Sequence, residues 1–353
     1  MAAPPPTSHK PPRALRSSAT VAMGFVTGML SGMHRLDRDP APLLQRAGIQ
    51  LTDRNGRVAL DRYALLYNLI IAELGDESLG VLSRPMPPGS FEFLCRGMLG
   101  SPTLEVALDR ALRFLRITLP ELSVAVHRNE RHAALEIIDL RQPPLARNDP
   151  ARVFAFEWLL RLLHGVACWF VGRGLALETV DFPYSRPAHA SDYPLVYTER
   201  SGFDSETLVA RMQADLLELP IHRDEAALEA FLVGAPGRIT MLYRRDREMV
   251  TRVRDLIHAS LPGNLSLEDA ASRLHLSTRT LHRRLEEEGS GFRIIKDAIR
   301  RDIAYARLAR STQPIAALAA DLGYADTSAF YRAFVSWSGV SPEHFRNRLQ
   351  RTA

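Results

Sequence analysis

The sequence predicts two folded parts, an α+β N-terminal domain and an all-α C-terminal domain with two helix-turn-helix units joined by a long helix. Strand-like and helical patterns alternate before residue 233, whereas only helical patterns follow residue 237. Near the C-terminus, two pairs of short helices flank a long amphipathic one. A length of 353 residues, 46% of them hydrophobic and 24% charged, is typical of about two soluble globular domains.

The N-terminal end combines an arm with a first helix. Residues 1–20 are rich in proline, lack acids and are predicted to be disordered. The apolar stretch 21–33 follows Arg13 and Arg16, as in a signal peptide, but it is short and runs directly into domain sequence. We therefore expect it to begin a folded domain over residues 21–235. No stretch approaches the roughly 20 apolar residues of a membrane span, so we expect no membrane association.

Three further helices are expected in this domain. Residues 60–74 repeat apolar side chains at helical spacing. Ser101 is a candidate N-cap, with Pro102 suited to the first helical position, and that helix should run to about Arg116. Residues 149–171 form a long apolar helix rich in aromatic residues. Aromatic residues at this spacing are typical of a core, and a ligand pocket is the alternative.

The strands of the domain are expected to form a small antiparallel sheet covered by helices. Residues 122–127 and 133–140 are separated by a polar stretch and should form a hairpin. Residues 175–182 should form a third strand. This pattern favours an α+β sandwich.

Catalytic and metal-binding signatures are absent from the sequence. The histidines show no metal-ligand spacing, and no P-loop or nucleophile elbow occurs. Cys95 and Cys168 stand far apart, which indicates a reducing compartment and two small core residues. We expect no enzymatic activity, no cofactor and no metal.

The positive charge is concentrated in the C-terminal part. Residues 1–237 carry about 25 basic and 27 acidic side chains, whereas residues 238–353 carry about 20 and 13. A Gly/Pro cluster at 233–237 marks the boundary, so the second domain should cover residues 236–353. A helix over 239–261, carrying five arginines, should open it. A basic domain is suited to a polyanion such as DNA.

The first helix-turn-helix unit begins at residue 265. Ser266 should cap its first helix and Ser277 its second. On the second helix two leucines, Leu281 and Leu285, should point inward, while the exposed stripe that would read base edges consists of Arg279, His282 and Arg283. Arg284 lies off this stripe and suits a phosphate contact or a solvated charge. Glu286 to Glu288 should lie away from DNA.

The second unit follows a long helix over residues 292–309, which should hold the two units at a fixed separation. Its helices are expected at 315–322 and 327–336, with Gly323 turning the chain between them. Two aromatic residues, Phe330 and Phe334, should be core, and the outer face should carry Thr327, Tyr331 and Arg332. Two readers in one domain suit two successive major-groove segments on one face of DNA.

Residues 265–346 resemble the DNA-binding domain of the AraC/XylS family of bacterial transcription regulators. The resemblance rests on the tandem units, on Gly339-Val340-Ser341-Pro342 and on Phe345-Arg346. Ser101-Pro102-Thr103-Leu104 and the segment 194–220 resemble the arabinose-binding-type N-terminal domain of one branch of that family. The family pattern matches the two sets of outer-face residues to base-facing positions. It usually has basic residues where Val335 and Ser336 stand, so fewer phosphate contacts are expected from the second reader. It also often has an acidic residue where Ala317 stands.

The resemblance implies a cytoplasmic regulator that binds double-stranded promoter DNA. It implies effector sensing and dimerisation by residues 21–235, although not arabinose itself, and activation through RNA polymerase. The expected partners are thus promoter DNA, RNA polymerase, an unknown small-molecule effector and a second copy in a homodimer. In one alternative the N-terminal domain only dimerises. In another it transfers methyl groups from damaged DNA, but the sparse cysteines argue against this.

Overall fold

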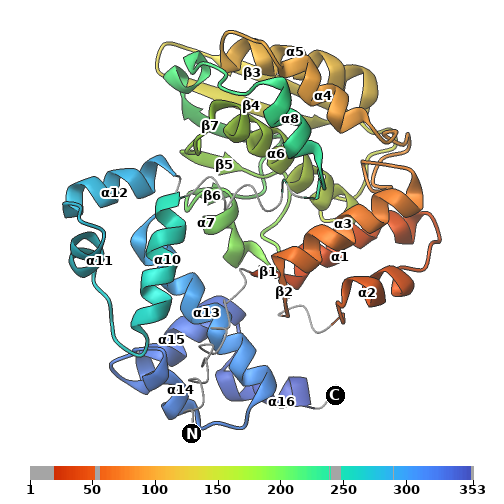
Figure 1. The fold of residues 1–353 in the computed structure, drawn as a ribbon. Coiled ribbons are helices and arrows are strands. Elements are labelled where there is room, and N and C mark those ends of the chain that lie inside the picture. The colour runs from red at the N-terminus through yellow and green to blue at the C-terminus, as the bar shows by residue number, and fades with distance from the viewer. Residues whose placement is uncertain (1–19, 52–55, 238, 240–247, 289, 351–353) are drawn as a thin grey trace, which may run out of the picture.

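The computed structural model describes residues 20–51, 56–237, 239, 248–288 and 290–350. An α+β N-terminal domain with a five-stranded sheet is followed by a C-terminal region of helices (Figure 1). The predicted fold class is therefore confirmed. Of the disordered arm predicted over residues 1–20, residues 1–19 lie outside the described residues, and Thr20 belongs to a strand instead.

The N-terminal domain begins with a short ribbon and five helices. Their bounds are β1 Thr20–Ala22, α1 Met23–Arg35, α2 Ala41–Ala47, β2 Arg57–Ala59, α3 Leu60–Leu74, α4 Ser90–Met98 and α5 Leu104–Thr118. The first helix and the helix over residues 60–74 are confirmed. The prediction that Ser101 caps α5 is wrong, because the side chain of Thr103 accepts the cap bond from Val106. An isolated bridge between Thr103 and Pro220 keeps the chain extended there, and the helix begins one residue later.

The sheet has the strand order β3-β4-β7-β5-β6, where β3 is Leu122–Arg128, β4 His132–Asp139, β5 Thr179–Asp181, β6 Ser201–Gly202 and β7 Leu208–Gln213. The predicted β3–β4 hairpin is confirmed, and only β5 and β6 pair in parallel. The predicted strand over 175–182 is shorter than expected. The amide of Leu175 donates to the Sγ atom of Cys168 and its carbonyl bonds to Nε2 of His164, so this part of the chain is bound to a helix instead.

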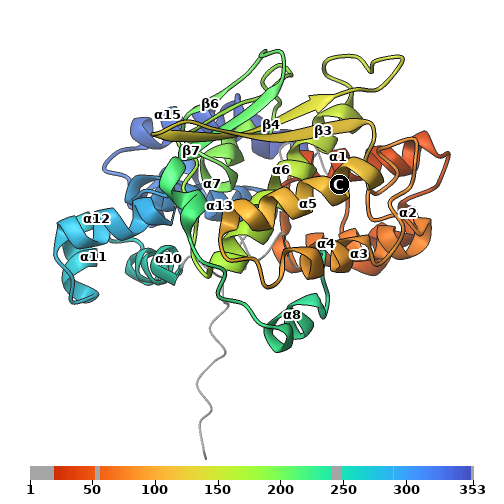
Figure 2. The same ribbon diagram turned by 90° about the horizontal axis from the view of Figure 1, so that it is seen from above.

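That helix, α6 Pro150–Val171, is the central core element (Figure 2). The side chain of Asp149 caps it, as the predicted boundary requires. In the described part of the chain it is the one helix long and apolar enough to cross a membrane, but 94% of its most apolar window is buried inside the protein. Its aromatic residues pack in the core, which favours the core interpretation over the pocket: Phe154, Phe156, Trp158, Trp169 and Phe170.

Short elements complete the domain: η1 Ala190–Asp192, α7 Tyr193–Val196, η2 Ala214–Glu218 and α8 Glu225–Leu232. The Gly/Pro cluster follows α8 and packs on α3, where Asn68 bonds to the backbone of Gly234 and Gly237. Of the helix predicted over 239–261, the structure describes α10 Glu248–Ser260. Residues 240–247, with three of its arginines, lie outside the described residues.

The C-terminal helices are α11 Leu267–Arg273, α12 Thr278–Glu287, α13 Phe292–Arg310, α14 Ile315–Asp321, α15 Thr327–Ser338 and α16 Pro342–Gln350. They surround two apolar clusters. Ile295 and Ile299 of α13 belong to the cluster of the first helix-turn-helix unit, and Tyr305 and Leu308 belong to that of the second. One helix thus contributes to both cores.

A buried group of four charged residues connects the two parts of the chain, and we call it the junction ion cluster: Arg57, Asp192, Arg301 and Asp302. An Arg57 nitrogen lies 3.0 Å from Asp192 and another lies 2.8 Å from Asp302, while Arg301 lies 2.7 Å from Asp192. All four side chains are at most 7% exposed. The first two residues belong to the N-terminal domain and the last two to α13. Asp192 also accepts a bond from the backbone of Ala22.

The charge balance of this cluster shifts the acidity of its members. Burial alone would raise the pKa of the Asp192 carboxyl, but Arg301 and Arg57 hold it well below its ordinary value. Burial would likewise lower the pKa of Arg57, whereas Asp192 and Asp302 raise it. Both groups are therefore ionised at neutral pH, and each arginine depends on its carboxylates for compensation.

Asp192→Asn should lower the free energy of unfolding at neutral pH by about 3–5 kcal/mol, because two buried guanidinium groups lose a charged partner. Since the folded-state pKa of Asp192 is depressed, its stabilisation is present at neutral pH and is lost as the pH falls below about 4 towards the folded-state pKa. The free energies of unfolding of the wild type and the variant should therefore become equal in strong acid. Denaturant unfolding across pH measures this difference.

Asp109→Asn is the matched control, because Asp109 pairs with Arg113 on the exposed face of α5. Its loss should change stability by less than about 1 kcal/mol. Equal effects of the two substitutions would contradict a structural role for the junction ion cluster.

Candidate nucleic-acid interface

The first helix-turn-helix unit is fixed by local hydrogen bonds. The Ser266 hydroxyl accepts from the backbone of Asp269 at 3.0 Å, and the Asp269 carboxylate accepts from the backbone of Ser266 at 3.3 Å, which makes a capping box. The Ser266 hydroxyl also donates to the Asp269 carboxylate at 2.8 Å, and this bond, together with the one from the Ser266 backbone, lowers the pKa of Asp269. Ser277 caps α12 by accepting from Thr280 at 3.1 Å. Both predicted caps are confirmed, because the signal for each lies within four residues.

The reading face of α12 is arranged as its spacing predicts. Leu281 and Leu285 are buried against α10, α11 and α13. The three predicted readers are exposed on the opposite side and lie together along a shallow groove of about 470 Å³: Arg279, His282 and Arg283. An exposed row of donors on such a helix is suited to base edges in a major groove.

One acid shares this face. Glu286 is expected to lie away from DNA, yet it lines the same groove as the readers and lies 3.2 Å from Nδ1 of His282. Its position three and four residues after the readers places it on their side of the helix. Glu288 differs, since its carboxylate accepts from the backbone of Met249 and Val250 and so caps α10.

The second reader is α15, which Asp326 caps by accepting from Ala329 at 2.7 Å. Phe330 and Phe334 are fully buried, as predicted. On the outer face Arg332 is exposed, whereas Thr327 and Tyr331 are half-buried, and the Tyr331 ring packs edge-on against Phe330. The residues at which the chain departs from the family pattern all face solvent: Val335, Ser336 and Ala317.

Arg300 of α13 connects the two units, a role that local sequence patterns do not indicate. Its guanidinium donates to the carbonyl of Gly323 at 2.9 Å and to the side chain of Asn264 at 3.2 Å. It also lies 4.5 Å above the ring of Tyr324, whose pKa burial raises to about 12. Gly323 has a left-handed φ of +70°, and a Cβ atom there would meet the carbonyl of Pro262 at 2.7 Å. The turn of the second unit therefore packs on the segment preceding the first.

The remaining reactive groups do not suggest other chemistry. Among the described residues, no group of three or more potential ligands could hold a metal ion. Both cysteines are buried, and burial raises the pKa of the Cys95 thiol, which makes it a poor nucleophile. The methyl-acceptor alternative thus gains no support from either cysteine.

Two family models match the chain. Residues 38–221 match the arabinose-binding domain of AraC transcription regulators, and residues 270–348 match a helix-turn-helix domain. The second match covers most of both predicted units, from α11 to α16.

Two curated relatives match this chain, one over most of its length and the other over about half. The ornithine utilization regulator of Pseudomonas aeruginosa is 30% identical over 84% of this chain and 86% of its own. The HTH-type transcriptional regulator VqsM of the same species is 29% identical over 47% of this chain and 54% of its own.

Among solved structures, the crystal structure of the transcriptional regulator CdpR from Pseudomonas aeruginosa is 22% identical over 92% of this chain and 98% of its own, with a TM-score of 0.32. The assignment accordingly rests on the sequence matches. With a family model over more than half of its length and a relative that matches it nearly end to end, the chain belongs to the AraC family of DNA-binding transcription regulators, in the branch with an arabinose-binding-type N-terminal domain.

Proposed function

We propose that this protein is a cytoplasmic activator that binds promoter DNA as a homodimer, contacts RNA polymerase and is controlled by a small-molecule effector. The observation that carries the DNA-binding part is the pair of capped, exposed helices α12 and α15, both anchored on α13. A rigid pair of readers suits two major-groove segments about one helical turn apart.

The apolar clusters indicate how the chain divides into two domains, to which we assign different functions. The cluster of the N-terminal domain runs from Val21 to Ile239, and the two clusters of the helix-turn-helix units begin at Met249. The clusters thus support a boundary between Ile239 and Met249, directly after the Gly/Pro cluster. We assign effector binding and dimerisation to the domain over residues 21–235 and DNA binding to the domain over residues 236–353.

Effector control is supported by the type of the N-terminal domain and by the name of one relative. The matching model describes a ligand-binding domain, and the relative that matches 84% of this chain regulates ornithine utilization. Ornithine is therefore the first metabolite to test, followed by other small metabolites.

Arg332→Ala should weaken binding to the specific operator by about 1–3 kcal/mol and relax the preference at one base pair, because an arginine can bond to two atoms of one guanine. Binding to a library of operator variants measures both effects. Arg284→Ala, off the reading face, should weaken binding equally on every sequence. A uniform loss for Arg332→Ala as well would contradict base reading by Arg332.

Glu286→Gln should tighten DNA binding by up to about 1 kcal/mol on all sequences, because an exposed carboxylate beside the readers repels phosphate groups. Glu343→Gln, in the first turn of α16, makes the same charge change away from both readers and should have a smaller effect. Weaker binding at one cytosine-containing position would instead mean that Glu286 accepts a bond from that base.

An effector should raise the melting temperature of the full chain, since a ligand at a hundredfold excess over Kd stabilises the folded state by about 2.7 kcal/mol. Thermal unfolding against a metabolite panel that begins with ornithine measures this. If no metabolite stabilises a protein that still binds its operator, the N-terminal domain serves for dimerisation alone.

A further inference from the structure

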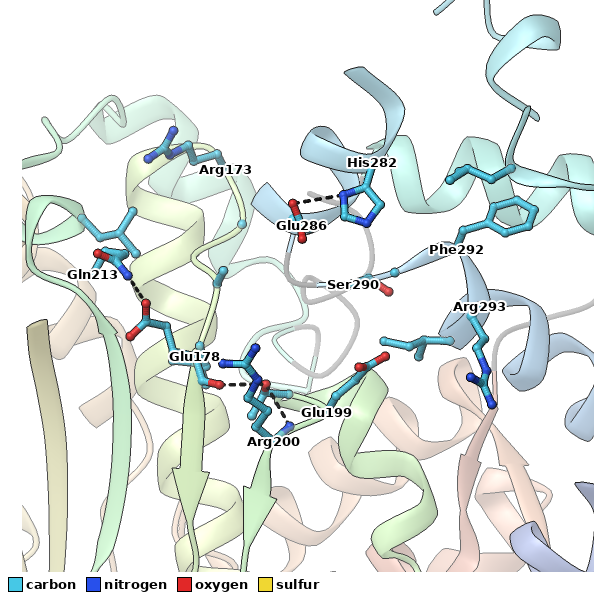
Figure 3. Close-up of a pocket in the computed structure, with 18 of the residues that line it drawn as sticks. Arg173, Glu178, Glu199, Arg200, Gln213, His282, Glu286, Ser290, Phe292 and Arg293 are labelled. Atoms are coloured by element: carbon cyan, nitrogen blue, oxygen red, sulfur yellow. Dashed lines mark hydrogen bonds and ion pairs between the residues drawn. The ribbon is translucent and has the colours of Figure 1, made fainter. Parts of the chain in front are cut away.

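A cavity of about 980 Å³ lies between the N-terminal domain and the first reader, and we call it the junction cavity (Figure 3). One wall lies around the β5–β6 edge of the sheet and comes from residues 173–174, 176–178, 198–200, 213 and 215–216. The other comes from Leu267, from His282 and Glu286 of α12, and from residues 290–294. Its volume is that of a small-molecule site.

The N-terminus of α13 opens into this cavity. Gly291 is the N-cap residue and has no side chain, and no described side chain caps this 19-residue helix. The first three helical residues all line the cavity: Phe292, Arg293 and Ile294. Their backbone N–H groups precede the first intrahelical bond, which Ile295 donates to Gly291. Such a terminus carries a partial positive charge and favours an anion.

Ser290 supplies an independent indication of a ligand. Ser290 lines the cavity and is 7% exposed, and its Oγ atom, which is itself buried, has no hydrogen-bond partner among the described residues. A buried hydroxyl without a partner costs free energy, and an acceptor in the cavity would remove that cost. The hydroxyl stands next to Gly291, so one carboxylate could accept from both the hydroxyl and the helix terminus.

Charges of both signs surround the same space. Arg293 is 94% exposed on the α13 side, and two arginines, Arg173 and Arg200, lie on the opposite wall. Four acids also line it. Glu178 bonds to His132 and Gln213, and Glu286 pairs with His282. In the described part of the chain, no ion pair or side-chain hydrogen bond occupies the carboxylates of Glu199 and Asp215. A simple anion would be repelled by these carboxylates, so a ligand that carries both charges fits better.

We propose that the junction cavity binds a small zwitterion, a molecule with one carboxylate and one cationic group. The carboxylate accepts from the Ser290 hydroxyl and from the N-terminus of α13, and the cationic group lies towards Glu199 and Asp215. This inference rests on the proposed effector control and assigns it a site. The ligand would contact both parts of the chain, which the junction ion cluster holds together farther along α13.

Gly291→Asp tests the site without disrupting the fold. Gly291 has φ −134° and ψ 154°, which any residue adopts, and an added Cβ atom would meet only the Ile294 side chain at 3.7 Å and 3.9 Å. An aspartate there would cap α13 and place a fixed negative charge where the ligand carboxylate binds. We expect a protein at least as stable as the wild type without ligand but unresponsive to it. Gly291→Ala adds the Cβ atom alone and should keep the response.

The probes are the standard protein amino acids and L-ornithine, tested by thermal unfolding and by calorimetric titration of the full chain. At least one should raise the melting temperature of the wild type and of Gly291→Ala but not of Gly291→Asp. Ser290→Ala should weaken its binding about tenfold or more. The amine-free carboxylate and the carboxylate-free amine of that probe should each bind more weakly than the probe.

Two results would overturn the proposal. One is that no amino acid binds; the other is that a bound amino acid acts equally on Gly291→Asp and wild type. Operator binding is measured alongside on every variant. If the wild type does not bind its operator specifically, the proposed function is refuted. If it does bind, and the ligand affinity is the same for Gly291→Asp and wild type, this site alone is refuted.

Discussion

The position of the DNA-binding helices relative to the N-terminal domain depends on a few buried charges. Arg57 and Asp192 come from two distant segments of that domain and pair with Arg301 and Asp302 on one turn of α13. Buried charges lose their hydration, and they tolerate burial only when each has a partner in good geometry. The cluster therefore disfavours small relative displacements of the two parts, because each would leave a charge uncompensated. A complete separation would instead return all four side chains to water.

The same helix organises everything on the C-terminal side. Its first half belongs to the core of one helix-turn-helix unit and its second half to the core of the other. Arg300, next to the charged pair, connects the turn at Gly323 with Asn264. The contacts that fix the spacing of the two readers and the contacts that hold the N-terminal domain thus lie on consecutive residues. A rotation of α13 would affect both.

Features determined by neighbouring residues could be predicted from the sequence. The helix over 60–74, the caps at Ser266 and Ser277 and the buried faces of α12 and α15 all follow from spacing within one or two turns. The misplaced cap of α5 and the shortened third strand have a different origin, since Pro220 and Cys168 impose them from elsewhere in the chain. The junction ion cluster and the role of Arg300 could not be predicted either, because they join residues that are far apart in the sequence. The place of Glu286 beside His282 also follows from helical periodicity, since the two residues are four apart on α12. The six base-reading residues remain predictions.

His282 and Glu286 border both the groove of the first reader and the junction cavity. A molecule bound in one space therefore alters the surroundings of the other. The two binding equilibria are linked in a thermodynamic cycle. In such a cycle the factor by which saturating DNA changes the affinity for the small molecule equals the factor by which the saturating small molecule changes the affinity for DNA. The promoter would thus be an effector of the sensor to the same degree that the metabolite is an effector of the promoter complex.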